Sequence, residues 1–520
     1  MAIQVAQVSR KQPRAQEAIT KSLPAPVRGW NDRDALSDMD PKFAVILDNM
    51  WCLPSKVINR KGTITWATGL TSQVETLIGY KPQSGTSALF AIAGTSVYNV
   101  TATGAVGAAV VTGLTNARFQ HVNMATSGGS FVMMVNGADK LRGWDGSSWW
   151  TDGGGTHDIT GVDTATCIGI EIFKRRLWLI QKNTAKVWYL PVDSIAGAAT
   201  AIDLGPLFSR GGTLMAMANW SLDAGIGIDD YAAFISDQGE VAVYKGSDPS
   251  SATTWALVGV FWVGAPIGRR CTTALAGDVL LINKDGLIPL SKALMSSRVN
   301  NSVALTDNIL NAVSQATSAY GSSFGWQVIQ YPAENMVLLN VPIAVGQQQQ
   351  YVMNTITGAW ARWKNLNANC FELFGDELYY GGAGSVFKVW QTQADSGTNV
   401  DFEVLQAFSY FGDRDSLKEW TLARPLIAIS NTAGLLYGIN TDFDKTAPTG
   451  VPTFSASTAG QWGSAKWGTG KWGGNPVVQK NWQSVMGVGY AAAIHMVGAT
   501  KSAQLEWSAT DFAYKRGGIL

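Results

Sequence analysis

The stretch over residues 213–263 constrains the fold more than any other part of the chain. It holds four short apolar segments separated by polar turns, at 213–220, 231–236, 241–246 and 255–263. The turn between the second and third segments contains Gly239, which favours a hairpin. Val241 and Val243 then face one side of a strand, because side chains alternate along it. Four antiparallel strands of this length match one blade of a β-propeller.

Similar groups of apolar segments recur along most of the chain, spaced by about 40–50 residues and without a fixed repeated motif. They lie at residues 76–100, 118–151, 166–190, 213–263, 271–290, 324–363 and 370–411. This period predicts an all-β fold, an irregular β-propeller of about six to eight blades. We expect strands from its two ends to pair and close the ring, which removes the free sheet edges. A pair of β-sandwiches is the alternative.

The parts of the chain on either side of this repeat differ from it in character. Residues 1–62 predict an N-terminal extended arm and docking segment. We assign the propeller to residues 63–425 and a smaller C-terminal β domain to residues 426–520.

Two segments predict helices. Ser37 or Asp38 is a suitable cap for a short helix over residues 41–49. The polar stretch 302–320 carries spaced apolar residues and predicts a second helix, between two of the blades.

The C-terminal domain contains a tryptophan-glycine repeat, QWGSAKWGTGKWGG. Trp462, Trp467 and Trp472 recur every five residues, and a glycine follows each of them. A repeated turn at the glycines would set the three indoles along one side. We predict that these tryptophans form an assembly interface, because tryptophan is common among interface hot spots. The alternative is that they pack inside the C-terminal domain itself.

Charge and composition narrow the class of protein. The 39 basic and 38 acidic residues nearly cancel, so net charge gives no argument for a nucleic-acid or membrane surface. The chain has 21 tryptophans, more than one core needs, and only 15% of its residues are charged. Both features favour large contacts between subunits. The N-terminal residues lack the apolar run of a signal peptide, and no apolar stretch is long enough to span a bilayer. We therefore expect the chain to fold in a cytosol.

No pattern in the sequence predicts catalysis or metal binding. His121, His157 and His495 stand far apart, and neither a nucleophile elbow nor a phosphate-binding loop is present. The neighbouring carboxylates at 229–230 and at 413 and 415 are predicted to be turn residues, since a glycosidase needs two carboxylates at a defined separation. The sequence thus predicts no enzyme, no catalytic residues, no metal and no cofactor.

Cysteines and tryptophans are predicted to be structural. The four cysteines are far apart in the sequence, which favours buried free thiols; they are Cys52, Cys167, Cys271 and Cys370. Eight tryptophans occupy strand or turn positions, namely Trp144, Trp149, Trp150, Trp178, Trp188, Trp360, Trp363 and Trp390. We expect them to pack between blades; stacking against a glycan on an exposed face and contact between subunits are the alternatives.

Three stretches resemble one protein family. They are VRGWNDRDALSDMDPKFAVILDNMWCLPSKVINRKG near the start, the stretch from FKRRLWLIQKNTAKVWYLPV to WVGAPIGRR, and the tryptophan-glycine repeat with LEWSATDFAYKRGG. Together they are similar to the tail nozzle proteins of short-tailed bacteriophages (podoviruses), also called tail tubular protein B. The resemblance follows the same order along nearly the whole chain.

The resemblance implies a structural virion protein of the tail, assembled in the host cytoplasm. Such a protein is a β-propeller subunit of a homohexameric ring below the adaptor, and its sixfold axis conducts and gates viral double-stranded DNA during ejection. Its implied partners are itself, the tail adaptor or head-to-tail connector, and tail fibres or tailspikes. The family has no catalytic residues to carry over. The alternatives are a glycan-binding or glycan-cleaving propeller of the phage tail, and a cellular scaffold.

Overall fold

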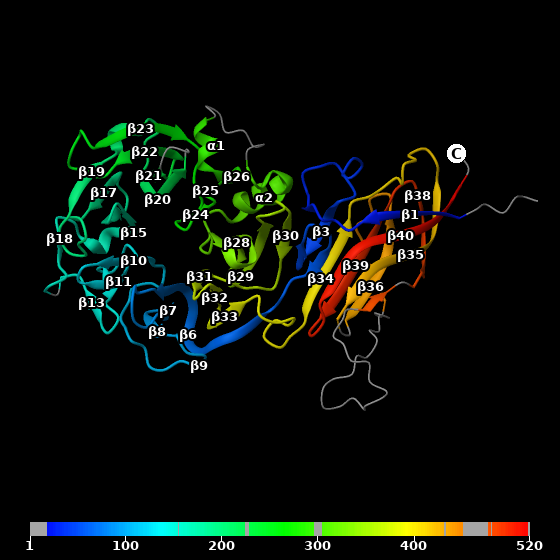
Figure 1. The fold of residues 1–520 in the computed structure, drawn as a ribbon, viewed down its shortest axis with the longest axis horizontal. Coiled ribbons are helices and arrows are strands. Elements are labelled where there is room, and N and C mark those ends of the chain that lie inside the picture. The colour runs from blue at the N-terminus through cyan, green and yellow to red at the C-terminus, as the bar shows by residue number, and fades with distance from the viewer. Residues whose placement is uncertain are drawn as a thin grey trace, which may run out of the picture.

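The structure is a computed structural model that describes residues 18–153, 155–223, 228–295, 304–430, 433–450, 477–479 and 481–517. Strands dominate these residues, and the molecule is elongated, with a disc of radiating sheets at one end and a β-sandwich at the other (Figure 1). The protein is therefore all-β, as the sequence predicts.

Within the described residues, seven blades surround one axis and form an irregular β-propeller; the first and seventh blades share strand β6. The innermost strands of successive blades lie beside one another around the ring. They are β6 (Thr63–Tyr80), β10 (Gln120–Thr126), β15 (Cys167–Phe173), β20 (Leu214–Asp223), β24 (Thr272–Leu275), β27 (Gln327–Tyr331) and β31 (Cys370–Phe374).

The other strands of each blade follow outward in chain order. They are β7 (Ala88–Ala93) and β8 (Ser96–Asn99) in the first blade; β11 (Gly129–Val135), β12 (Arg142–Trp144) and β13 (Trp149–Thr151) in the second; β16 (Arg176–Gln181), β17 (Lys186–Tyr189) and β19 (Thr200–Asp203) in the third; β21 (Ile228–Ser236), β22 (Glu240–Gly246) and β23 (Trp255–Trp262) in the fourth; β25 (Asp278–Asn283) and β26 (Gly286–Pro289) in the fifth; β28 (Met336–Ala344), β29 (Gln347–Asn354) and β30 (Trp360–Trp363) in the sixth; and β32 (Glu377–Gly381) and β33 (Ala383–Val389) in the seventh. The four strands expected over residues 213–263 are confirmed, and they pair in the expected order.

Strand β6 closes the ring because its two halves belong to two different blades. Its first half pairs with β33, starting with Thr63 opposite Val389. Its second half pairs with β7, starting with Val74 opposite Ala93. The strand is thus the outermost strand of the seventh blade and the innermost strand of the first. The expected closure by strands from the two ends of the propeller is confirmed, and no free edge remains at this seam.

The second domain is a β-sandwich built from segments at both ends of the described chain. One sheet contains β1 (Ile19–Pro24), β4 (Met50–Cys52), β5 (Val57–Asn59), β35 (Lys418–Ile429), β37 (Val477–Gln479), β38 (Gln483–Gly489) and β40 (Leu505–Arg516). The other contains β2 (Gly29–Trp30), β3 (Phe43–Asp48), β34 (Val400–Gln406), β36 (Gly434–Thr441) and β39 (Ala492–Thr500). An aromatic cluster fills the space between them, where Phe411 lies 5.0 Å from Phe512 and 5.5 Å from Tyr514, between ring centroids.

The two domains share one continuous sheet and a buried junction. β30 of the sixth blade pairs with β2, so the sheet runs on into the sandwich. Trp363 and Trp390 of the propeller stack with centroids 5.5 Å apart, and Trp51 of the sandwich packs edge-on against both. Arg60, fully buried, pairs with Asp395 at 2.6 Å. The junction thus joins the two domains through a continuous sheet, a largely buried ion pair and packed indoles.

The helix predicted over residues 41–49 is wrong, because this segment forms strand β3. Its apolar run FAVIL is buried between β2 and β34, where a strand can bury both of its faces. The second predicted helix is confirmed where it lies in the described residues, as a short 3-10 turn at Asp307–Ile309 and α2 (Leu310–Tyr320). A further helix, α1 (Leu290–Met295), follows the fifth blade and was not expected.

The predicted boundaries 1–62, 63–425 and 426–520 do not match the division of the strands. The segment expected as an extended arm supplies β1 to β5 to the sandwich. The last part of the group predicted at residues 370–411 contains β34, which pairs with β3 and β39 in the sandwich and not with the seventh blade. The reason is that the first half of β6 already occupies the outer position of that blade.

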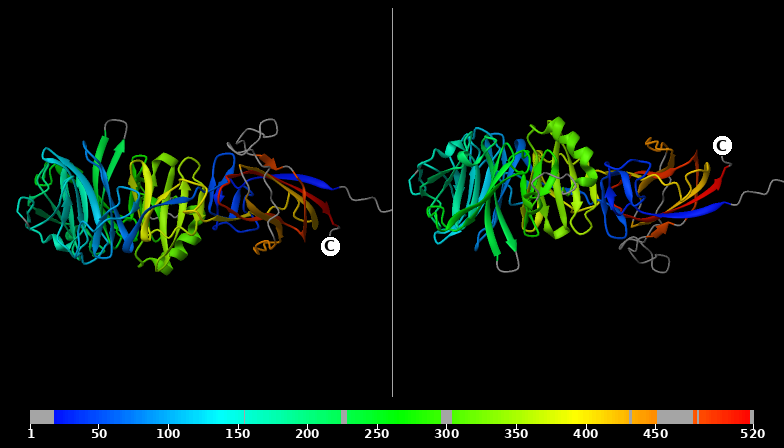
Figure 2. Two further views of the ribbon diagram at one scale, coloured as in Figure 1. Left: turned by 90° about the horizontal axis from the view of Figure 1, so that it is seen from below. Right: turned by 90° about the horizontal axis from the view of Figure 1, so that it is seen from above.

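The propeller disc has two different faces (Figure 2). The hairpin of β20 and β21 projects from one face, where the innermost strands end. Helix α2 lies toward the opposite face, and the loop that follows it leads to the start of β27. That opposite face, where the innermost strands begin, carries the site described next.

Candidate site in the central channel and its mouth

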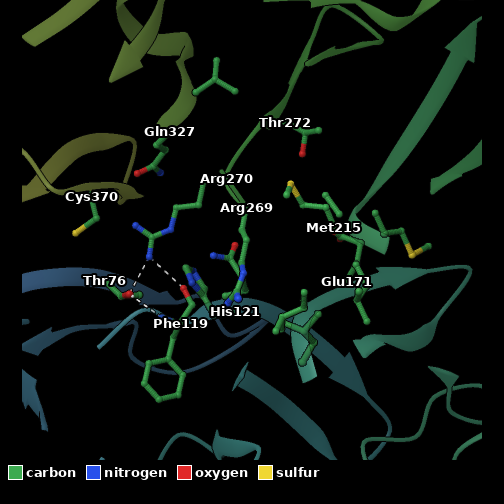
Figure 3. Close-up of a pocket in the computed structure, with 18 of the residues that line it drawn as sticks. Thr76, Phe119, His121, Glu171, Met215, Arg269, Arg270, Thr272, Gln327 and Cys370 are labelled. Atoms are coloured by element: carbon green, nitrogen blue, oxygen red, sulfur yellow. Dashed lines mark hydrogen bonds between the residues drawn. The ribbon is translucent and has the colours of Figure 1, made fainter. Parts of the chain in front are cut away.

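The innermost strands of all seven blades enclose a narrow channel along the propeller axis. Side chains from each of them line a cavity of about 210 Å³ (Figure 3). The channel is therefore largely filled by protein, with room for a few water molecules.

Arg270 crosses this channel. It stands just before β24 of the fifth blade, and its Nη2 donates hydrogen bonds to the carbonyl of Glu75 at 3.0 Å, to Thr76 Oγ1 at 2.8 Å and to the carbonyl of Phe119 at 3.1 Å. These acceptors belong to the first and second blades, so one side chain connects distant parts of the ring (Figure 3). All three are uncharged oxygens, and burial lowers the pKa of Arg270. The guanidinium stays charged nonetheless, because its ordinary pKa is so high.

Glu171 of β15 lies in the same cavity. Its Oε1 accepts hydrogen bonds from the backbone N–H of Ile172 at 3.1 Å and from Asn219 Nδ2 at 3.4 Å. No cation forms an ion pair with it within the described part of the chain. Burial disfavours the carboxylate and raises the pKa of Glu171 to about 7.

The second carboxylate of the cavity is compensated by neighbours. Glu372 of β31 lies 3.5 Å from Nε2 of His121 and 4.0 Å from Nζ of Lys81. The other two histidines lie elsewhere in the structure. His157 stacks on an indole of the second blade, and His495 lies buried in the sandwich beside Glu403 at 3.1 Å. Among the residues that the structure describes, no three ligand side chains are grouped to hold a metal ion.

The channel opens into a wider mouth of about 670 Å³ on the face where the innermost strands begin. Segments from five blades line it. Its basic side chains are Arg118, Lys182, Arg269 and Arg270, against one carboxylate, Glu75. Arg269 and Arg270 line both the mouth and the inner cavity, so they mark the boundary between the two. This end of the channel is therefore positively charged.

Two of these arginines hold fixed positions. Arg118 pairs with Glu75 at 3.1 Å, and its guanidinium carbon lies 4.4 Å from the centroid of the Phe324 ring. The guanidinium carbon of Arg270 is 5.6 Å from the same ring. Phe324 thus has two cations against its ring, which stabilises their placement.

Arg269 differs from both because it has no partner. Within the described residues it forms no ion pair, and no oxygen accepts a hydrogen bond from its guanidinium. It is only partly exposed, and burial together with the neighbouring charge of Arg118 lowers its pKa. A guanidinium held beside other cations without an acceptor is suited to bind an anion.

The predicted assembly residues Trp462, Trp467 and Trp472 lie outside the described residues, so their role stays a prediction. The eight tryptophans expected between blades are all buried or half-buried in the hydrophobic clusters of the propeller. All four cysteines are buried and free, as predicted, and burial raises their pKa values, that of Cys52 to about 12. Of the carboxylates expected in turns, Asp413 does accept turn hydrogen bonds from the backbone of Asp415 and Ser416, whereas Asp230 stands in β21.

No sequence pattern predicted the residues that define this site. Arg118, Glu171, Arg269 and Arg270 come from three blades, and each is unremarkable among its neighbours in the sequence. One feature could have indicated these residues. Each lies in or next to a segment that is predicted as the first strand of a unit. First strands of a propeller meet at its axis, so charges on them gather there.

Comparisons with known proteins do not assign the chain to a family. No protein-family model matches the chain, and no curated protein matches it. Similar solved structures include BBS1N in complex with ARL6DN, soaked with lead, at 10% identity and a TM-score of 0.39, covering 65% of this chain and 99% of that one. YCF48 bound to D1 peptide is similar at 10% identity and a TM-score of 0.37, covering 64% of this chain and 96% of that one. The β-propeller domain of Myceliophteria_thermophila Cps50 (Swd1) is similar at 11% identity and a TM-score of 0.38, covering 64% of this chain and 100% of that one. The chain is a β-propeller protein with an attached β-sandwich, a class that its own strand order defines.

The structure contains no helix with the length and apolar character that a membrane span requires, within the residues it describes.

Proposed function

We propose that this protein is a structural virion protein, the tail nozzle subunit of a short-tailed bacteriophage. It would act as a homohexameric ring below the adaptor, conduct and gate double-stranded DNA during ejection, and contact tail fibres or tailspikes. Its place is the tail of the virion, after assembly in the host cytoplasm. The proposal starts from the resemblance of three stretches to that family, and a feature of the surface supports it.

The observation that carries the proposal is a pair of exposed apolar edge strands at different places on the molecule. β23 is the outermost strand of the fourth blade, where the side chain of Val258 is 52% exposed beside Leu257 and Trp262. β38 is an edge strand of the sandwich, where Met486 is 92% exposed beside Val488. Exposed edges of this kind attract another chain. Because the two edges differ, contact between them is head-to-tail, and head-to-tail contacts build rings.

In this proposal the DNA passes between subunits rather than through a propeller. A B-DNA duplex is about 20 Å across, with grooves of about 6 and 12 Å. The channel of the propeller holds only about 210 Å³, and Arg270 crosses it. The near balance of charge, with a formal net charge of +1, suits a conduit that must not retain phosphates.

The experiment is to measure the mass and shape of the purified full chain by light scattering and negative-stain electron microscopy. A hexamer has about six times the chain mass of 55.5 kDa and shows a ring with a central opening. The variants Val258→Lys and Met486→Lys should each shift the protein toward monomers, because lysine blocks an edge strand. Val345→Lys is the matched control, since Val345 is fully exposed in the turn between β28 and β29 and belongs to neither edge.

A protein that stays monomeric at all concentrations, alone and with the adaptor, would refute the nozzle proposal. A ring that tolerates both lysine variants would refute the two edges as its contacts.

A further inference from the structure

We propose that the mouth of the propeller channel is a binding site for an acidic peptide segment of a partner protein. One carboxylate of that segment enters between Arg269 and Arg270. The site belongs to the propeller itself and does not depend on the tail nozzle proposal.

Charge at the bottom of the mouth is unbalanced. Four basic side chains line it and only Glu75 opposes them. That carboxylate is already engaged by Arg118 at 3.1 Å. The hydrogen bonds of Arg270 go to two carbonyls and one hydroxyl, and the carboxylates of Glu75 and Glu372 act on its charge without forming a direct ion pair with it. Arg269 lacks any acceptor within the described residues. A bound carboxylate accepts hydrogen bonds from the guanidinium of Arg269, and its negative charge reduces the repulsion among the arginines.

The arginines are also held in place before a ligand arrives. The ring of Phe324 supports Arg118 at 4.4 Å and Arg270 at 5.6 Å, and the bonds of Arg270 across the channel fix its guanidinium. Prior ordering lowers the entropy that binding must overcome. The mouth therefore has the features of a formed site, with a cavity, fixed cations and a free donor at its base.

The shape and chemistry of the walls favour a peptide. The rim offers hydroxyl and amide side chains, Thr95, Asn116, Ser322 and Ser323, together with the backbone of several loops, which suit the polar groups of a peptide chain. A volume of about 670 Å³ exceeds what one small inorganic anion fills. A nucleic acid strand is not favoured, because its recognition needs cations along a groove and aromatic faces for stacking. Here the cations converge on one point, and arginines already cover the Phe324 ring.

The test uses the full chain and a fluorescently labelled hexaglutamate peptide, with binding followed by fluorescence anisotropy at low salt. Arg269→Gln should weaken binding about tenfold or more, the effect of losing one charge-assisted contact. Lys182→Gln, at the rim, should weaken it less, since Lys182 is exposed. Arg28→Gln is the matched control, because Arg28 also lies over an aromatic ring, at 4.6 Å from Phe43, but in the sandwich. Its affinity should equal that of the wild type.

Two further ligands test which kind of anion the mouth binds. Hexaglutamine should not bind, and inorganic pyrophosphate should compete weakly at most. The proposal is overturned if Arg269→Gln binds hexaglutamate as tightly as the wild type while keeping the same melting temperature. It is also overturned if pyrophosphate or single-stranded DNA binds at the mouth and hexaglutamate does not. Arg269→Lys, which keeps the charge, separates a loss of charge from a disturbance of the fold.

Discussion

Replacing Glu171 by glutamine should make the protein more stable at alkaline pH, although it removes a charged residue. Burial raises the pKa of this carboxyl from 4.5 to about 7. The folded state therefore holds a proton that the unfolded state releases between these two values, and stability falls as pH rises from about 4.5 through about 7. Each pKa unit corresponds to about 1.36 kcal/mol, so a difference of about 2.5 gives an upper bound near 3.4 kcal/mol. Because Glu171 is only partly buried, screening by water lowers the expected effect to about 1–2 kcal/mol.

The assay is urea-induced unfolding followed by tryptophan fluorescence at pH 5 and pH 8. Glu171→Gln keeps the shape of the side chain and an oxygen that can accept the hydrogen bond of Ile172. It should match the wild type at pH 5 and exceed its stability at pH 8.

A carboxyl with the opposite shift provides the control. Burial opposes the ionisation of Glu240, but hydrogen bonds from Ser209 and Arg210 outweigh it and lower the pKa of Glu240. Its contribution to stability is present above the unfolded pKa and is lost as pH falls through the folded pKa. Glu240→Gln should therefore destabilise the protein at pH 8, and by less at acid pH. If Glu171→Gln loses stability at pH 8, or shows the same difference from wild type at both pH values, the reasoning about channel burial is wrong.

Three further predictions concern the junction, the tryptophan-glycine repeat and catalysis. Arg60→Met should cost about 3–5 kcal/mol in urea unfolding, because it leaves Asp395 without its buried partner, and a loss below 1 kcal/mol would contradict this. Trp467→Ala combined with Trp472→Ala should leave a soluble propeller but weaken the ring or its attachment to the adaptor, as light scattering and adaptor pull-down would show; an insoluble double variant, or one with normal mass and affinity, would contradict it. Purified protein should release no reducing ends from host polysaccharide, and release that disappears in Glu171→Gln would show hydrolase activity instead.

The propeller could be predicted from the sequence because its blades are local. β20 to β23 are consecutive in the chain, and the alternation around Val241 and the turn at Gly239 specify their order without long-range information. The sandwich could not be predicted in the same way. β3 pairs with β34 and β40 with β1, over separations of hundreds of residues, so the apolar run FAVIL was compatible with either helix or strand.

The candidate site was unpredictable for a related reason. Arg269 and Glu75 both line the mouth because their blades surround the same axis. The local sequence does not indicate which blades come together there. Paired carboxylates and metal ligands are recognised in a sequence by their close spacing along the chain. The structure instead brings together charges from segments in or next to the strands of several blades.

The chain can finish folding only late in its synthesis, because β6 and the strands of the sandwich pair with segments far away in the sequence. β1 pairs with β40, so that Ile19 stands opposite Tyr514, and the first half of β6 must wait for β33. A ribosome that adds about 5–20 residues per second needs roughly 25–100 s to make the chain between those two partners. During that time β1 has no partner, whereas β2 pairs with β3 and β4 with β5 soon after they are made. The edge strand β38 belongs to the sheet that forms last, so only complete chains present a finished sandwich surface to other proteins.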